Sequence, residues 1–387
     1  MKIGILTSSR ADYSQYYPLL LALAKDPFFK VEILAFGSHL SQKHGYTITQ
    51  ILEDKFEVRF RLQTLAEGDD PQSIDTSMSG TIAVFAELWA SETFDLVFAF
   101  GDRYEMFAAC ASLVAFGMPM AHIHGGETTT GAIDNVFRHA ITQMAQWHFT
   151  TTEVYRDKVI QMKGANDGVY NVGALSIDNL YALPLLSMAE FRERFGIDMS
   201  VPSILITFHP ETIAFSKNEL FVEQLIAALR ETSGYQFIIT MPNADTGGNM
   251  VRKKLLQFID DTEHAIGVES FGTIGYLSCM KYASLMLGNT SSGFLEASFF
   301  PKYVINLGTR QSGRILTPNI ITCAIEKEKI KQAIKDVPAE PIAAMNLYGD
   351  GTAAKRIAAV LKDEVWPRLQ KAPANESLHG AQFKTPQ

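Results

Sequence analysis

The segment Asp95-Leu-Val-Phe-Ala-Phe-Gly-Asp-Arg103 decides the fold class of this chain. Its apolar run ends at Phe100 and is typical of a strand that is buried on both faces of a parallel sheet. A helical pattern covers residues 104–116, and a second short apolar strand begins at Met120. Strand, helix and strand in this order predict a parallel sheet with right-handed helical crossovers.

The same alternation of strand and helix extends along almost the whole chain. Apolar runs predict further strands at residues 2–7, 31–36, 56–62, 148–151 and 169–172, and in a second series at residues 203–208, 236–240, 265–268, 284–287, 303–306 and 320–323. Helical patterns lie between them, at residues 12–25, 74–89, 153–162, 218–231, 249–261, 274–281, 293–299 and 327–335. We therefore expect an α/β fold of two doubly wound, Rossmann-like domains that face each other across a central cleft.

The division between the two domains is predicted near residues 175–187, where Pro184 interrupts the pattern. The expected domains are residues 1–178 and 179–352, followed by an amphipathic helix at residues 353–371. Residues 372–387 are polar and are expected to form a disordered tail. A length of 387 residues agrees with two domains, because it exceeds what one core usually accommodates.

Composition and charge argue against several classes of function. The chain has 47% hydrophobic and 20% charged residues, as an ordinary globular protein does, and its formal charge of −8 argues against a nucleic-acid or membrane-surface partner. The sequence has no apolar run of the ~18 residues that a membrane span needs, and its N-terminus does not resemble a signal peptide. Three widely spaced cysteines fit a reducing compartment, so we expect a soluble cytoplasmic protein.

Titratable residues gather where the predicted strands of the first domain end. Asp102 and Arg103 follow the strand at residues 95–100, and His122-Ile-His124-Gly-Gly-Glu127 ends the next strand. Further polar residues follow near one face of the next helix, at spacings i, i+4 and i+5: Asp134, Arg138 and His139. Open α/β sheets bind their ligands at the carboxyl ends of the strands, so we expect these groups to meet at one site.

Each of these residues also has a simpler structural explanation. Asp102 could cap the helix that follows its strand, and Gly125-Gly126 could be only a tight turn. His122 lies in an apolar strand and is better explained as a core histidine with satisfied hydrogen bonds than as a catalyst. The concentration of titratable groups at consecutive strand ends nevertheless favours a chemical role for the cluster.

The second domain has its own candidate residues at strand ends. His209 follows a predicted strand and precedes Pro210, where capping or packing would also explain it. The loop at residues 288–293 consists of small residues before a helix, whose exposed N–H groups would bind an anion. Glu296 lies on that helix, where a carboxylate in the first turn is also favourable without any ligand.

Two loops complete the candidate site of the second domain. Arg310 and Arg314 lie in a loop at residues 308–314 and suit planar recognition of phosphate, although a solvated pair of surface arginines is the alternative. Asn243 lies in a turn-rich loop at residues 241–248, which turn chemistry explains without a ligand.

A set of short motifs occurs in one order between Met1 and about Leu369. They are Ser9-Arg-Ala-Asp-Tyr13, Gly101-Asp-Arg103, His122-Ile-His-Gly-Gly-Glu127, Ile133-Asp134 with Arg138-His139-Ala-Ile-Thr142, His209-Pro210, the loop at residues 289–296 and Gly308-Thr-Arg-Gln-Ser-Gly-Arg314. Together they resemble the hydrolysing UDP-N-acetylglucosamine 2-epimerases, which serve the synthesis of sialic acid and related nonulosonic acids. The resemblance implies the GT-B fold, with UDP bound mainly by the C-terminal domain, the sugar facing the N-terminal domain, and C-terminal helices that cross back to the N-terminal domain.

The resemblance also implies the reaction. A base removes the C2 proton of a UDP-sugar, UDP departs and leaves a glycal, and water adds to release the free 2-epimer. This chemistry needs a positioned base and cationic or N–H groups around the diphosphate. The expected acid, base or helper residues are Asp102, Glu127, Asp134, His209 and His124. The expected substrate-binding residues are Arg10, Arg103, Arg138, Asn243, Thr290, Ser291, Ser292, Glu296, Arg310 and Arg314, with Glu296 assigned to the ribose hydroxyls.

Neither a metal nor another cofactor is expected, since the sequence has no G-x-G-x-x-G fingerprint and no metal-ligand spacing. The expected partner is the UDP-sugar itself, bound by a homodimer or homotetramer, with no nucleic acid and no membrane. Three alternatives stay open at this point: a GT-B glycosyltransferase, a non-hydrolysing 2-epimerase that keeps UDP on the product, and a nucleotide-sugar sensor.

The sequence departs from the family pattern at one position. The branch that makes N-acetylmannosamine has His-Ile-Glu-Gly-Gly-Glu at the strand end, whereas this chain has His124 in place of the first glutamate. Either Glu127 takes over with the usual substrate, or the histidine suits a sugar with an acetamido group at C4, since imidazole can accept or donate a hydrogen bond. The branch that resembles this chain here acts on UDP-N,N′-diacetylbacillosamine for legionaminic acid.

Overall fold

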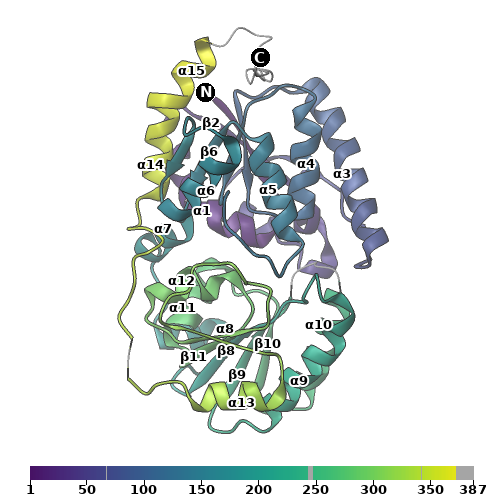
Figure 1. Cartoon of the computed structure of the whole chain (residues 1–387), viewed down its shortest axis with the longest axis vertical. Coiled ribbons are helices and arrows are strands. Elements are labelled where there is room, and N and C mark those ends of the chain that lie inside the picture. The colour runs from purple at the N-terminus through teal and green to yellow at the C-terminus, as the bar shows by residue number, and fades with distance from the viewer. Residues whose placement is uncertain (67, 243–246, 341, 372–387) are drawn as a thin grey trace, which may run out of the picture.

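The computed structural model describes residues 1–387 except 67, 243–246, 341 and 372–387. It contains two α/β domains, which lie one above the other along the long axis of the molecule (Figure 1). The first sheet has seven strands in the order β3-β2-β1-β4-β5-β6-β7, and the second has six in the order β10-β9-β8-β11-β12-β13. All the paired strands are parallel, which confirms the predicted doubly wound fold of the GT-B type.

Helices cover both faces of the first sheet. Its strands are β1 (Lys2–Thr7), β2 (Lys30–Phe36), β3 (Val58–Leu62), β4 (Leu96–Phe100), β5 (Met120–Ile123), β6 (Trp147–Thr150) and β7 (Val169–Asn171). Its helices are α1 (Arg10–Ala24), α2 (Ile48–Glu53), α3 (Pro71–Ser91), α4 (Tyr104–Val114), α5 (Asp134–Met144), α6 (Glu153–Lys163) and α7 (Leu175–Ala182). Every residue of β4 is buried, which explains its uninterrupted apolar sequence.

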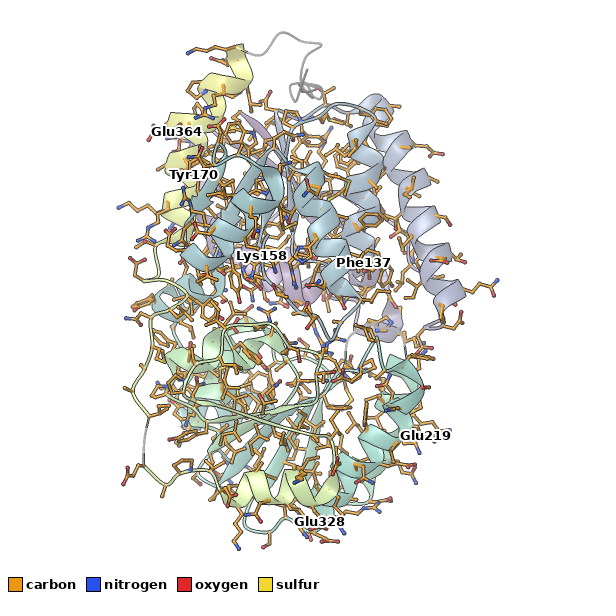
Figure 2. The ribbon with its side chains drawn as sticks, in the orientation of Figure 1. Phe137, Lys158, Tyr170, Glu219, Glu328 and Glu364 are labelled. Carbon is orange, nitrogen blue, oxygen red and sulfur yellow. The ribbon has the colours of Figure 1, made fainter. Side chains whose placement is uncertain are left out.

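The second sheet repeats the arrangement. Its strands are β8 (Ser203–Thr207), β9 (Gln236–Thr240), β10 (Ala265–Val268), β11 (Leu285–Gly288), β12 (Val304–Leu307) and β13 (Ile320–Cys323). Its helices are α8 (Met188–Phe195), α9 (Asn218–Arg230), α10 (Gly248–Asp260), α11 (Gly272–Tyr282), α12 (Glu296–Phe299) and α13 (Lys327–Lys335). Figure 2 shows charged side chains such as Glu219 and Glu328 at the periphery of this domain, while apolar side chains fill its interior.

The strand orders determine where a ligand can bind. In the first sheet the direction of winding reverses between β1 and β4, and in the second sheet it reverses between β8 and β11. Loops that leave neighbouring strands in opposite directions open a crevice at the carboxyl ends of those strands. The residues that follow β1, β4, β8 and β11 are therefore the ones that a ligand between the domains would meet.

Three details differ from the sequence-based expectations. The helix expected at residues 293–299 is a 3₁₀ turn, η4 (Ser291–Gly293), followed by the single-turn helix α12. The anion-binding loop therefore lacks the long helix that was expected behind it. The boundary expected between residues 178 and 179 lies inside α7, and the helices α2, α7 and α8 were not predicted.

The C-terminal segment returns to the first domain. It consists of α14 (Ala353–Val360), the π-helical turn η5 (Leu361–Val365) and α15 (Trp366–Lys371), drawn in yellow beside the upper domain in Figure 1. Ile357, Leu361 and Val365 are fully buried in the core that also contains residues of β1 and α1. Asp178 of α7 accepts hydrogen bonds from the backbone N–H groups of Ala353 (2.9 Å) and Ala354 (2.7 Å), and so caps α14. Within the described part of the chain, no helix is both long and apolar enough to cross a bilayer.

We expect Asp178→Ala to destabilise the docking of the C-terminal segment, because it leaves two buried N–H groups of α14 without an acceptor. The loss should be about 2 kcal/mol, which lowers the thermal midpoint of unfolding by roughly 4–8 °C. The matched control is Asp350→Ala, which removes a half-exposed partner of Arg356 and should change the midpoint little. Equal midpoints for the two variants would contradict the capping role of Asp178.

Candidate active site between the two domains

The cleft between the domains contains two adjoining hollows. One has a volume of about 190 Å³ and the other of about 180 Å³. Both are lined by Ala11 after β1, by His209 after β8, and by Thr290 and Ser291 after β11. These shared walls make the two hollows parts of one site, at the positions that the strand orders indicate.

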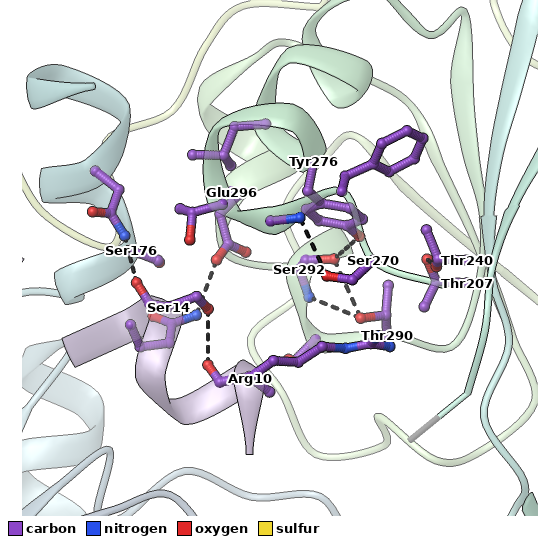
Figure 3. A pocket seen from close by; sticks show the side chains of 18 of the residues that line it. Arg10, Ser14, Ser176, Thr207, Thr240, Ser270, Tyr276, Thr290, Ser292 and Glu296 are labelled. Atoms are coloured by element: carbon purple, nitrogen blue, oxygen red, sulfur yellow. Dashed lines mark hydrogen bonds between the residues drawn. The ribbon is translucent and has the colours of Figure 1, made fainter. Parts of the chain in front are cut away.

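The first hollow, shown in Figure 3, is lined mostly by residues of the second domain, many of which carry hydroxyl groups. The hydroxyl of Tyr276 lies 2.6 Å from that of Ser292, which in turn lies 3.2 Å from the hydroxyl of Thr290. Glu296 borders the same hollow and accepts a hydrogen bond from Gln15 of the first domain at 3.1 Å. Burial raises the pKa of Glu296. Neutral hydrogen-bond donors and one buried carboxylate suit the hydroxyl groups and the base of a nucleoside better than they suit an anionic ligand group such as a phosphate.

Arg10 reaches across this hollow from the first domain (Figure 3). Its guanidinium donates to the carbonyl of Met241 at 3.0 Å and to that of Glu269, so it joins the start of α1 to the ends of β9 and β10. The turn before α1 is held by Asp12, whose carboxylate accepts the backbone N–H groups of Ser8 (2.8 Å) and Ser9 (2.9 Å). Arg10 is therefore presented by a rigid turn.

The second hollow brings together three of the predicted acid, base or helper residues: Asp102, Asp134 and His209. Asp102 is paired with Arg138, and the residue at the N-cap position of α4 is Arg103, so the alternative that Asp102 caps this helix is wrong. Asp134 begins α5, and one of its carboxylate oxygens lies 3.9 Å from the guanidinium of Arg310. Two carboxylates and a histidine thus surround one space.

Glu127 differs from these carboxylates, because it is fully buried and held on both oxygens. Oε2 accepts from Arg314 of the second domain at 2.6 Å, and Oε1 lies 2.8 Å from Nδ1 of His124 and 3.1 Å from the hydroxyl of Thr151. Burial alone would raise the pKa of Glu127, but the attraction of His124 and Arg314 outweighs it and lowers the pKa to about 2. A carboxylate with so low a pKa is a weak base.

The two histidines of the strand-end motif have different environments. His122 is fully buried, with Nε2 2.8 Å from the carbonyl of Gly101 and Nδ1 3.1 Å from the hydroxyl of Thr142. The prediction that it is a satisfied core histidine is confirmed. His124 has a left-handed backbone with φ of 67°, which costs energy for a residue with a Cβ atom. Its Nε2 atom is buried and has no hydrogen-bond partner among the described residues.

The predicted arginines are all held by protein groups. Arg138 is buried and donates to the Glu127 carbonyl (3.1 Å) and the Thr129 hydroxyl (3.0 Å) in addition to Asp102, so it supports the site from behind. Arg103 pairs with Glu105 at 3.0 Å. Arg310 donates to the carbonyl of Pro210 at 2.7 Å. Asn243 lies outside the described residues.

Two supporting residues were missed by the sequence analysis. Glu211 accepts the backbone N–H groups of Thr309 and Arg310, both at 3.1 Å, and thereby holds the arginine loop. Asn289 exchanges two hydrogen bonds with the backbone of His209, at 2.7 and 2.8 Å. Glu211 could have been noticed as a carboxylate two residues after a strand-end histidine. The backbone of residues 269–273, which lines the first hollow, leaves no such signal in the sequence.

The described residues contain no group of three or more His, Cys, Asp or Glu side chains arranged to hold a metal ion. The chemical groups of the site are therefore carboxylates, a histidine, hydroxyls, backbone amides and arginines.

Comparison with known proteins relates this arrangement to one family. A hydrolysing UDP-N,N′-diacetylbacillosamine 2-epimerase of Legionella pneumophila is 30% identical over 362 residues, which cover 93% of this chain and 95% of the relative. A hydrolysing GDP/UDP-N,N′-diacetylbacillosamine 2-epimerase of Campylobacter jejuni is 31% identical over 325 residues, or 84% of each chain. The crystal structure of the UDP-GlcNAc 2-epimerase from Neisseria meningitidis bound to UDP-GlcNAc has a TM-score of 0.76 at 18% identity, with 93% of this chain and 99% of that chain covered, and so shares the fold.

The family model described as UDP-N-acetylglucosamine 2-epimerase matches residues 21–362, which is most of the sequence. The chain therefore belongs to the UDP-N-acetylglucosamine 2-epimerase family.

Proposed function

We propose that this chain is a hydrolysing 2-epimerase, which converts a UDP-2-acetamido sugar into UDP and the free 2-epimer through a glycal. The observation that carries the proposal is the joined pair of hollows. Asp102, Asp134 and His209 surround one of them, and the hydroxyl-rich loop with Glu296 lines the other. A nucleotide bound in the hydroxyl-rich first hollow would place its sugar in the second hollow, beside Asp102, Asp134 and His209. The names of the similar proteins from L. pneumophila and C. jejuni support the same reaction.

The two carboxylates of the hollow suit the proton transfers at C2. Inversion at this carbon requires that one proton be removed from one face and another be delivered to the opposite face. We assign removal to Asp102 and delivery to Asp134, since both line the hollow and come from different elements. We do not assign the base role to Glu127, because both of its oxygens are held by Arg314, His124 and Thr151 and it does not line the hollow.

The departing UDP requires groups that stabilise negative charge. We assign this role to His209, to the hydroxyl and amide groups of Thr290 and Ser291, and to Arg310. All four residues line the second hollow. Glu296 is assigned to the ribose hydroxyls, since it borders the first hollow, where the nucleotide is proposed to bind.

His124 motivates a choice of substrate within the class. Its buried Nε2 atom has no partner among the described residues, and such atoms usually gain one when a polar ligand binds. An acetamido group at C4 of the sugar would bond this atom, and the similar proteins from L. pneumophila and C. jejuni are named for UDP-N,N′-diacetylbacillosamine. We therefore propose the UDP-linked 2,4-diacetamido-trideoxy sugar as the preferred substrate, and nonulosonic acid synthesis as the use of the product.

Product analysis tests the proposed reaction. The purified chain is incubated with UDP-N-acetylglucosamine and with its 2,4-diacetamido-trideoxy analogue, and products are identified by NMR. Free UDP and a free 2-epimer are expected. A 2-epimer still linked to UDP, turnover only with a sugar acceptor, or binding without turnover would each contradict the proposal.

The choice of substrate predicts a kinetic preference. We expect kcat/KM to be at least about tenfold higher for the 2,4-diacetamido-trideoxy sugar, since one satisfied buried polar group is worth about 1–3 kcal/mol. The comparison uses both UDP-sugars side by side under identical conditions. A preference for UDP-N-acetylglucosamine would show that His124 does not mark the substrate.

Asp102→Asn should lower kcat by about 10²–10⁴-fold, because the amide keeps the shape of the carboxylate but cannot accept a proton as a base. The affinity for UDP, measured by calorimetry, serves as the control and should change little, whereas the thermal midpoint of unfolding should fall because Asp102 is the charged partner of the buried Arg138. Near-normal turnover in this variant would remove Asp102 from the chemistry.

Turnover should not depend on a divalent metal. Cysteine and histidine are scattered along the sequence, and no metal-binding cluster occurs among the described residues. Assays after treatment with EDTA should give the same kcat as untreated protein. Activity that EDTA abolishes and a divalent ion restores would show that this expectation is wrong.

A further inference from the structure

We propose that Arg314 is a positioning residue that acts on His124 through Glu127 when the two domains close, and not a phosphate-binding residue. This inference rests on the proposed function, and it reassigns one of the arginines that the sequence placed at the diphosphate. Arg314 belongs to the second domain, whereas Glu127 and His124 belong to the first. The proposed positioning therefore exists only in the closed arrangement.

The guanidinium of Arg314 is already committed to two protein partners. Nη1 donates to Glu127 Oε2 at 2.6 Å, and Nε donates to the side chain of Gln311 at 2.6 Å. Gln311 in turn donates to the carbonyl of Asn289 at 2.8 Å, at the start of the hydroxyl-rich loop. A chain of hydrogen bonds thus connects the expected diphosphate loop with Glu127.

Glu127 connects Arg314 to His124, because it contacts both side chains. One of its oxygens faces Arg314, and the other faces Nδ1 of His124 at 2.8 Å. The ring of His124 is held by this polar contact and by the ring of Phe100, whose centroid lies 4.7 Å away. Without Arg314, the buried carboxylate of Glu127 would lose its positively charged partner, which is strongly unfavourable and would force Glu127 and its neighbours to rearrange.

The loop that carries Arg314 lies in close contact with the loop around residues 130–131 of the first domain. The backbone N–H of Thr130 donates to the carbonyl of Ser312 at 2.8 Å, across the cleft. Gly131 packs so tightly against this loop that a Cβ atom on it would clash with the carbonyl of Thr309. Gly131→Ala therefore offers a way to disturb closure that changes no charge and leaves Arg314 itself in place.

Arg314→Met should lower kcat by about 100-fold, the cost of misplacing a group that orients the sugar by roughly 1 Å. The dissociation constant for UDP, measured by calorimetry, should stay within about threefold of the wild-type value, since Arg314 is not assigned to phosphate. Arg310→Met is the contrasting variant and should weaken UDP binding by about tenfold, the effect of one lost charge-assisted hydrogen bond. Arg314→Lys should recover part of kcat, because it restores the charge.

Two further variants separate positioning from a general loss of stability. The double variant Glu127→Gln with Arg314→Met should have a kcat no lower than either single variant, because residues that act as one unit are not additive. Gly131→Ala should also lower kcat, and it should weaken UDP binding as well because its Cβ atom would press on the backbone of Thr309 and Arg310. Its fall in kcat still tests the closed arrangement if Arg314→Met alone folds poorly.

The inference is overturned if Arg314→Met weakens UDP binding as much as Arg310→Met does. It is also overturned if the fold-loss in kcat of the double variant equals the product of the fold-losses of Glu127→Gln and Arg314→Met. Either result, obtained with an active wild-type chain, concerns only the role of Arg314. A wild-type chain that turns over no UDP-sugar would instead overturn the proposed function itself.

Discussion

The ion pair between Glu127 and Arg314 joins the two domains at the centre of the site. Both side chains are buried, so each charge is tolerated only because the other is present. The pair can form only when the loop at residues 308–314 lies against the strand-end motif of the first domain. This electrostatic constraint links the closed arrangement of the domains to the geometry of the residues that the reaction needs.

The topology assigns different tasks to the two domains. In each sheet the winding reverses at a central pair of strands, and the two reversal points face each other across the cleft. The first domain contributes the carboxylates Asp102 and Asp134, and the second contributes His209 and the hydroxyl-rich loop after β11. In the proposed reaction, proton transfer at the sugar and stabilisation of the leaving group therefore come from separate domains, which act together only when the cleft is closed.

The fold could be predicted well because most strands are short apolar runs, and the central strands are buried on both faces. The cluster around Asp102 could also be found, since its members follow consecutive strand ends. The pairing of Glu127 with Arg314 could not be predicted, because the two residues are 187 positions apart and meet only through the relative placement of the domains. For the same reason the sequence made Glu127 a candidate base, whereas its neighbours hold it as a carboxylate of low pKa. The length of the helix α12 was overestimated, because a run of small and apolar residues does not define where a helix begins.

The central claim of this account is that a base at the strand ends removes the C2 proton of a UDP-sugar, and that UDP then leaves. Turnover in D₂O tests this claim most directly, with the product examined by NMR and mass spectrometry. The account predicts free UDP and a free 2-epimer that carries one deuterium at C2, because the new proton at this carbon comes from an exchangeable group. A free sugar that retains hydrogen at C2, or a sugar that remains attached to UDP, would contradict the account.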